Sequence, residues 1–269
     1  MHEADTLSAA AIREGLPTCT IGQHVVYYET IDSTNRVAKE LGRAGAPEGT
    51  LVIAEAQTSG RGRLNRQWLA PPGSSLLMSL LFRPTMAPLQ AARLTMVCSL
   101  AVADAIEATT PLHAALKWPN DILLGDKKAG GILTELGLRD ERLEFVVVGI
   151  GLNVNVAFCQ EAPAYPPDAA PDTSQASLGA LAEQSTSILQ EVGRAMPRLP
   201  LLRHFLAQVE RRYLALRAGW LPNQEWSRRL ATLGQVVTVA APDGALTGLA
   251  EGVDADGALL IRLADCSVV

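Results

Sequence analysis

A short basic loop at residues 60–66, with the sequence GRGRLNR, carries the side chains best suited to binding an anion. Arginine presents a planar fork of N–H donors that matches a carboxylate or a phosphate, and glycine lets the backbone approach a ligand closely. The chain as a whole has a formal net charge of −5, so this positive charge is a local feature. We expect the loop to contact an anionic ligand; a solvated basic surface loop is the alternative interpretation.

A further cation stands at Lys117, the first residue of the sequence KWPND at positions 117–121. Residues 114–116 are apolar and predict a buried strand, and Pro119 fixes the turn that follows. A cation at such a strand end can lower the barrier when a carboxylate attacks a phosphate, because two like charges must then approach each other. The alternative is that residues 119–121 form only a turn and that Lys117 points to water.

Three other polar segments could line the same site. Residues 33–35 (STN) are good helix N-caps, and a helix N-terminus also offers donors to a polar ligand. The double glycine at 130–131 indicates a bulge or a close backbone approach in a strand. Residues 149–155 (GIGLNVN) lack the third glycine of a dinucleotide-binding motif, but Asn153 and Asn155 alternate with apolar residues and therefore share one strand face.

Hydrophobic patterns predict the elements that position these residues. Apolar runs joined by short turns predict consecutive hairpins, and hence an α+β fold with a mixed, largely antiparallel sheet rather than a doubly wound parallel one. We expect the helices at 32–44 and 88–109 to cover one face of this sheet, and the proline-rich stretch 159–173 to be a linker. The predicted strands are 24–31, 50–56, 75–83, 114–118, 122–124, 130–136, 143–156, 235–240, 245–253 and 258–263, and two more helices are predicted at 177–195 and 199–217.

In this order the segments resemble the motifs of the biotin protein ligases, over residues 24–156. The matching elements are Ser33-Thr34-Asn35, Gln57 ahead of the arginine loop, the loop itself, the unbroken KWPND sequence, and the strands around 128–133 and 151–153. The resemblance implies a catalytic domain over residues 1–222 that is similar to the class II aminoacyl-tRNA synthetases, followed by a small SH3-like β-barrel over residues 223–269. The basic loop departs from the family at Leu64 and Asn65, where an arginine and a glycine are common.

The resemblance also implies an activity and its partners. The enzyme would activate biotin with MgATP to biotinyl-5′-AMP and pyrophosphate, and then transfer biotin to a lysine of the biotin carboxyl carrier domain of acetyl-CoA carboxylase or another biotin-dependent carboxylase. Lys117 and Arg63 would be catalytic, and no metal site made of protein ligands alone is expected. The implied biotin-binding residues are Ser33, Thr34, Asn35, Gln57, Gly60, Arg61 and Lys117. The implied nucleotide-binding residues are Arg61, Gly62, Arg63, Trp68, Lys117, Asn120, Lys128 and Asn153.

Composition and charge argue against several other classes of protein. A pI of about 5.4 and the few residues ahead of the first core strand argue against a DNA-binding domain. Four scattered cysteines and the lack of a secretory leader favour free thiols in the cytoplasm. The most apolar stretch, 89–108, is interrupted by charges, so we expect no membrane span. A lipoate or octanoate ligase of the same fold, a non-catalytic biotin-binding sensor, and either a monomer or a homodimer stay open.

Overall fold

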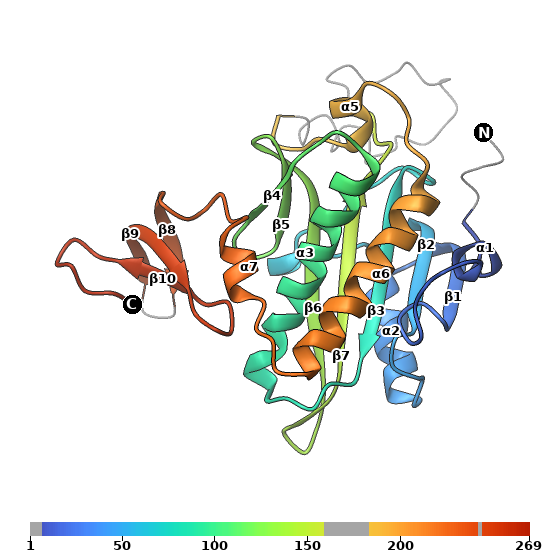
Figure 1. Cartoon of the computed structure of the whole chain (residues 1–269), viewed down its shortest axis with the longest axis horizontal. Coiled ribbons are helices and arrows are strands. Elements are labelled where there is room, and N and C mark those ends of the chain that lie inside the picture. Colours follow the sequence, from blue (N-terminus) through green and yellow to red (C-terminus); the bar gives the residue numbers. More distant parts are fainter. Residues whose placement is uncertain (1–6, 159–182, 242–243) are drawn as a thin grey trace.

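The computed structural model describes residues 7–158, 183–241 and 244–269 (Figure 1). Its main element is a seven-stranded sheet in the order β1-β2-β3-β7-β6-β5-β4. All neighbours are antiparallel except β1 and β2, which confirms the predicted α+β fold with a largely antiparallel sheet. The strands are β1 (Val25–Ile31), β2 (Leu51–Gln57), β3 (Ser75–Phe82), β4 (Ala114–Lys117), β5 (Asp121–Leu124), β6 (Lys127–Arg139) and β7 (Arg142–Asn153).

Helices cover both faces of this sheet. The long helices α3 (Ala92–Thr109) and α6 (Arg198–Arg217) run side by side over one face, where they bury the larger core (Figure 1). The helix α2 (Thr34–Arg43) packs on the opposite face, over Val52 and Phe145. The expectation that the helices at 32–44 and 88–109 share a face is therefore wrong. Strands as uniformly apolar as β3 are buried on both sides, so each face needs its own cover.

Helix α3 follows a short 3₁₀ turn, η3 (Pro88–Ala91). By length and composition the stretch Pro88–Thr109 could cross a membrane, although charged residues interrupt it, and 67% of its most apolar window is buried inside the protein. Packing between the sheet and α6 accounts for this apolar composition. Of the cysteines in the described part of the chain, Cys98 lies buried on this helix, while Cys19 and Cys266 are exposed, and all three are free thiols.

The segment ahead of α6 differs from its prediction. Instead of one helix over 177–195, the described residues contain only the short α5 (Ile188–Val192). Residues 184–186 run extended beside β6, because Lys128 N donates to Gln184 O (2.9 Å) and Thr186 N donates to Lys128 O (2.9 Å). The helix predicted at 199–217 is confirmed as α6. The predicted linker at 159–173 lies outside the described residues.

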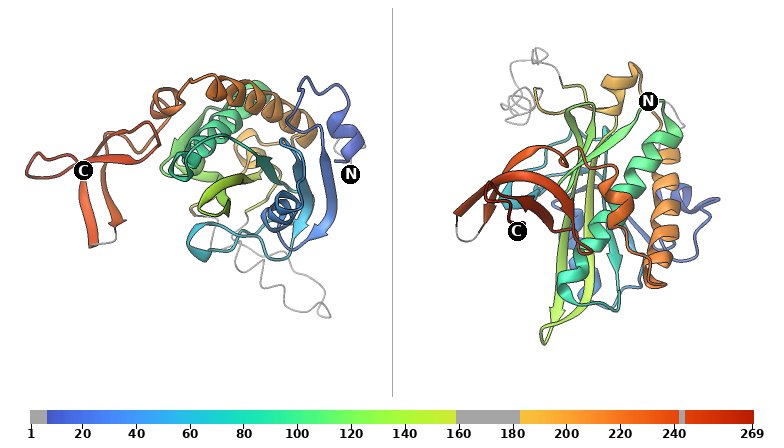
Figure 2. Two further views of the ribbon diagram at one scale, coloured as in Figure 1. Left: turned by 90° about the horizontal axis from the view of Figure 1, so that it is seen from below. Right: turned by 60° about the vertical axis from the view of Figure 1, so that its left-hand side comes forward.

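The C-terminal strands form a separate small sheet. Strands β8 (Val236–Ala241), β9 (Gly244–Val253) and β10 (Leu259–Arg262) pair antiparallel in the order β10-β9-β8, and the sheet projects from one side of the main body (Figure 2). The strands confirm the prediction. The described residues do not close into the expected SH3-like barrel, because closure needs a longer tilted set of strands than three short ones. The remaining short helices are α1 (Ala9–Arg13) and α7 (Asn223–Ser227).

Candidate active site

A row of paired residues crosses the sheet on the α2 face. Lys117 pairs with Asp121, Asp121 with Gly131, and Gly131 with Gly151. Directly paired residues project to the same face of a sheet. The strand register thus brings Lys117, from the KWPND sequence, onto the same face as the glycines of the two other motifs.

A second row of paired residues lies two residues away along each strand. It shows that this is the face on which α2 packs. Gly149 pairs with both Leu133 and Ser79, and Ser79 pairs with Val52, which packs under α2. The two rows therefore extend from the N-terminal end of α2 across the part of the sheet that α2 leaves uncovered.

Glycine is required on this face because two large side chains lie against it. A Cβ atom at Gly149 would lie 2.0 Å from Asn35 Oδ1, and one at Gly151 would lie 2.5 Å from the Trp68 indole. A Cβ atom at Gly131 would lie 3.2 Å from the same indole. The prediction of a close approach at the double glycine is thus confirmed. The bulge predicted there is also present, as a register shift between β5 and β6.

The first turn of α2 is linked to the end of β2. Gln57 Oε1 accepts hydrogen bonds from Thr34 N (2.7 Å) and from Thr34 Oγ1 (3.1 Å). Ser33 occupies the N-cap position, but its side chain makes no capping hydrogen bond. The expectation that residues 33–35 cap their own helix is therefore wrong in detail, since Gln57 satisfies the first donor. This contact joins two of the predicted biotin-binding elements.

Asn35 is the centre of a buried polar network. Its Nδ2 donates to Leu133 O (3.2 Å) and to Glu135 Oε2 (2.9 Å), and its Oδ1 lies 2.6 Å from Ser79 Oγ. Lys39 Nζ completes the network at 2.7 Å from Glu135 Oε1.

The network also keeps its carboxylate charged. Burial raises the pKa of Glu135, but the hydrogen bonds from Lys39 and Asn35 outweigh it and hold that pKa below its usual value. Glu135 is therefore ionised at neutral pH and fixes the Asn35 amide. Sequence reasoning missed Ser79 and Glu135; a serine and a glutamate within apolar strands were the available signals.

Trp68 lies between the glycines and Lys128. The Lys128 ammonium is 5.8 Å from the centroid of the Trp68 ring and 2.5 Å from Asp121 Oδ1. Among the described residues, Trp68 Nε1 is buried without a hydrogen-bond partner. Lys128 is thus held over the same row of residues as Lys117.

Two more buried polar atoms on this face have no partner in the described part of the protein. They are Ser75 Oγ and Asn153 Oδ1, from residues that pair directly across β3 and β7. Asn153 also donates from Nδ2 to Thr186 O (3.1 Å), which fixes the direction of its amide. Buried polar atoms are normally satisfied, so this end of the face fits the donors and acceptors of a polar ligand.

The arginine loop is a closed hairpin that reaches the KWPND corner. Trp68 N donates to Gly60 O (2.9 Å), and Gly62 N donates to Arg66 O (2.7 Å). Arg63, which is exposed, points one guanidinium nitrogen to within 3.4 Å of Asn120 Oδ1. The structure therefore brings together two motifs that lie far apart in the sequence.

The KWPND corner is itself fixed to β6. Asn120 Nδ2 donates to Ile132 O (2.6 Å), and Ile132 N donates to Asn120 O (3.0 Å). The Lys117 side chain is exposed and makes no hydrogen bond or ion pair with any residue that the structure describes. Arg61 is exposed as well.

The structure brings these predicted residues together on the α2 face of the main sheet. The Thr34–Gln57 contact lies at one end, Trp68 and Asn153 lie at the other, and the exposed cations Arg63 and Lys117 stand beside them. Within the described ranges, no group of three or more His, Cys, Asp or Glu side chains is placed to hold a metal ion. Such a site can bind an elongated ligand with a polar head and stabilise negative charge at its middle.

The sequence matches two family models. The model of the biotin/lipoate A/B protein ligase family covers residues 27–153, and the model of the biotin protein ligase C-terminal domain covers residues 232–267. The bifunctional ligase/repressor BirA of Bacillus subtilis is 36% identical over 258 residues, which are 95% of this chain and 74% of that protein. The biotin–[acetyl-CoA-carboxylase] ligase of Paracoccus denitrificans is 34% identical over 234 residues, or 86% of this chain and 91% of that protein.

The fold matches solved structures over the same range. The biotin protein ligase from Aquifex aeolicus in complex with biotin and ATP superposes with a TM-score of 0.72 and 26% identity, covering 92% of this chain and 95% of that one.

Replacing Gly149 tests the close approach of Asn35. In Gly149→Ala the new methyl group must displace Asn35, which Ser79, Leu133 and Glu135 hold in place, so we expect the free energy of unfolding to fall by about 1–3 kcal/mol. Thermal denaturation measures this. Gly252→Ala is the matched control, because the nearest atom to its Cβ would be 3.8 Å away. Equal melting temperatures for the two variants would contradict the account.

Proposed function

This chain belongs to the biotin protein ligase family, and we propose that it activates biotin with MgATP to biotinyl-5′-AMP and pyrophosphate and then transfers biotin to a carrier lysine. One observation carries the proposal: the strand register and the Arg63–Asn120 contact bring the cations Lys117 and Arg63 to the sheet face that holds the Thr34–Gln57 pair, where a phosphate would meet them. Both halves of an acyl adenylate would be accommodated on this face.

The polar head of biotin would bind at the first turn of α2. Gln57 Oε1 accepts both hydrogen bonds from Thr34, so the Gln57 amide nitrogen is left as the donor for a ligand. Ser33 and Asn35 lie buried in the same turn of α2. Gly60 follows at the start of the loop, where a Cβ atom would lie 3.2 Å from that nitrogen. A ureido group offers both acceptors and donors, which suits this set of side chains.

The nucleotide would occupy the opposite end. Trp68 Nε1 and Asn153 Oδ1 are a buried donor and a buried acceptor without partners among the described residues, and Lys128 stands over the Trp68 ring. A nucleotide offers the complementary groups and a face to stack on Trp68. Mg²⁺ would arrive bound to the phosphates of ATP, where it supplies further charge neutralisation.

The exposed cations would serve the chemical step. A biotin carboxylate oxygen forms a bond to the α-phosphorus of ATP, and the bond from that phosphorus to the bridging oxygen breaks as pyrophosphate leaves. Lys117, Arg61 and Arg63 would reduce the repulsion between the two anions, and Gly62 lets the loop backbone approach the phosphate. In the second half-reaction the carrier lysine attacks the acyl carbonyl and AMP leaves.

The carrier protein and the cellular location are further parts of the proposal. The name of the Paracoccus relative supports the carrier domain of acetyl-CoA carboxylase, and the carriers of other biotin-dependent carboxylases would have the same chemistry. The net charge of −5 supports a protein that does not bind DNA, and we propose a cytoplasmic location. We also propose the division into a catalytic domain at 1–222 and a C-terminal domain at 223–269. A homodimer is compatible with all of this.

Biotin-dependent exchange of labelled pyrophosphate into ATP tests the proposed function, with lipoate and octanoate measured in parallel. We expect exchange with biotin alone, because the buried polar groups around Thr34 suit a ureido head. Exchange only with lipoate or octanoate would contradict the proposal in favour of a lipoate ligase. Biotin binding without exchange would contradict it in favour of a biotin sensor.

Removing the Lys117 ammonium separates catalysis from stability. We expect Lys117→Ala to lower the rate of adenylate formation by about 10²-fold or more, because a charge close to the reacting phosphate is lost. The melting temperature should change little, since the side chain is exposed. Lys127→Ala, which removes the same charge from the exposed start of β6, should keep the normal rate. A variant with normal turnover and a much lower melting temperature would show that Lys117 is structural.

A further inference from the structure

The free edge of the main sheet is covered by the chain that leads into the C-terminal sheet. Strand β4 is the last strand of the main sheet, and its residue Leu116 forms a parallel bridge with Leu230. Leu116 N donates to Arg229 O (2.8 Å), and Ala231 N donates to Leu116 O (2.8 Å). The segment 229–232 thus acts as one more short strand against the residue that precedes Lys117.

The residue that follows Lys117 is held from the same side. Trp118 N donates to Thr232 Oγ1 (2.9 Å), and Thr232 is 9% exposed. The Trp118 side chain donates from Nε1 to Gly257 O (3.0 Å), in the turn between β9 and β10. Both peptide neighbours of Lys117 are therefore bonded to the C-terminal part of the chain.

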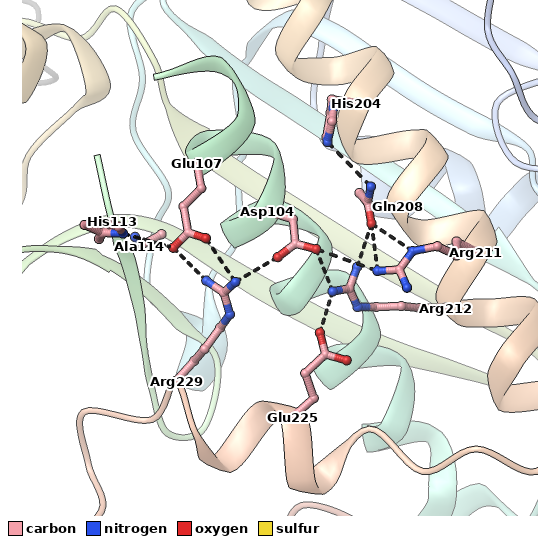
Figure 3. Close-up of polar contacts among 10 residues, drawn as sticks. All are labelled: Asp104, Glu107, His113, Ala114, His204, Gln208, Arg211, Arg212, Glu225 and Arg229. Atoms are coloured by element: carbon pink, nitrogen blue, oxygen red, sulfur yellow. Dashed lines mark hydrogen bonds and ion pairs between the residues drawn. The ribbon is translucent and has the colours of Figure 1, made fainter. Parts of the chain in front are cut away.

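Ion pairs fix the segment 229–232 to helix α3. The Arg229 guanidinium lies 2.8 Å from Glu107 Oε1 and 2.9 Å from Asp104 Oδ1 (Figure 3). Asp104 also pairs with Arg212 of α6 (2.6 Å), which is 2% exposed and reaches Glu225 of α7 at 2.5 Å. The segment 229–232 is thus paired directly with α3, and α3 is paired in turn with α6, so the segment is a rigid support for the edge strand.

Glu107 connects this support to the start of β4 as well. Its Oε1 accepts a hydrogen bond from Ala114 N (3.3 Å) in addition to the contact with Arg229 (Figure 3). The four-residue strand is thus held at its first residue by α3, and by the segment 229–232 at Leu116 and at Trp118, which directly follows the strand.

We propose that Thr232 is a positioning residue for Lys117 in adenylate formation. The proposal rests on the proposed function. Lys117 has no side-chain partner among the described residues, so the direction of its backbone is what aims its ammonium group. The hydrogen bond from Trp118 N to Thr232 Oγ1 fixes the peptide that follows Lys117, and a displacement of about 1 Å at such a group can lower a rate about 10²-fold.

The variants Thr232→Val and Thr232→Ser test the proposal in the full-length chain. Valine keeps the shape of threonine and removes the acceptor, whereas serine keeps the hydroxyl. We expect Thr232→Val to slow single-turnover formation of biotinyl-AMP by about tenfold or more, with biotin affinity measured by calorimetry unchanged, and Thr232→Ser to retain most of the rate. The matched control Thr247→Val, which removes an exposed hydroxyl pair with Thr238 in the C-terminal sheet, should keep the normal rate.

A double-mutant cycle distinguishes positioning from a general loss of stability. If Thr232 acts through Lys117, Thr232→Val should have no further effect on the rate in the Lys117→Ala background. Should Thr232→Val fail to fold, Thr232→Ala, which also removes the hydroxyl that accepts from Trp118 N, carries the same cycle.

Three outcomes would overturn the positioning role: a normal rate in Thr232→Val, equal losses in rate and biotin affinity, or fully additive effects in the cycle. A wild-type chain that forms no biotinyl-AMP would instead refute the proposed function itself, so the two failures are distinguishable.

Discussion

The site depends on the close approach of Asn35 and Trp68 to the main sheet. Most of the sheet is buried under side chains on both faces, but Gly149 and Gly151 leave the α2 face of β7 without a side chain in two successive rows. Asn35 packs against the first glycine and Trp68 against the second. Any side chain at either position would separate the polar groups at the end of α2 from the aromatic and amide groups beyond them. The glycines of the motif GIGLN are thus required for packing, independently of any contact with a ligand.

Electrostatic organisation follows from this geometry. Lys39 and Lys128 are neutralised by Glu135 and Asp121, respectively, so they contribute to structure around the site. Lys117 has no anionic partner among the described residues, and it stands at the solvent side, next to the rigid face. Because the Lys117 side chain has no partner among those residues to hold it, its position depends on the backbone of β4, and fraying of that strand would misplace the ammonium group. Hydrogen bonds between residues 229–232 and both neighbours of Lys117 hold the backbone in place, and the positioning role that we propose for Thr232 rests on them.

The sequence was sufficient for those features that are encoded locally. Uniform apolar runs identified the strands, and the glycine pairs identified the close approach. The features it could not supply depend on contacts between distant residues. The capping of Thr34 by Gln57, the Asn35–Glu135 network and the pairing of Leu116 with Leu230 each join segments that have no local signal for one another. The position of α2 opposite α3 was mispredicted for the same reason, because an apolar run does not reveal which helix covers which face.

We infer that one sheet face binds both halves of an acyl adenylate. A crystal structure with a non-hydrolysable analogue of biotinyl-5′-AMP tests it most directly. We expect the ureido ring beside Thr34 and Gln57, the phosphate-like group between Arg63 and Lys117, and the base beside Trp68. An analogue bound on another surface, or bound with its base at Thr34 and its ureido ring at Trp68, would contradict the account.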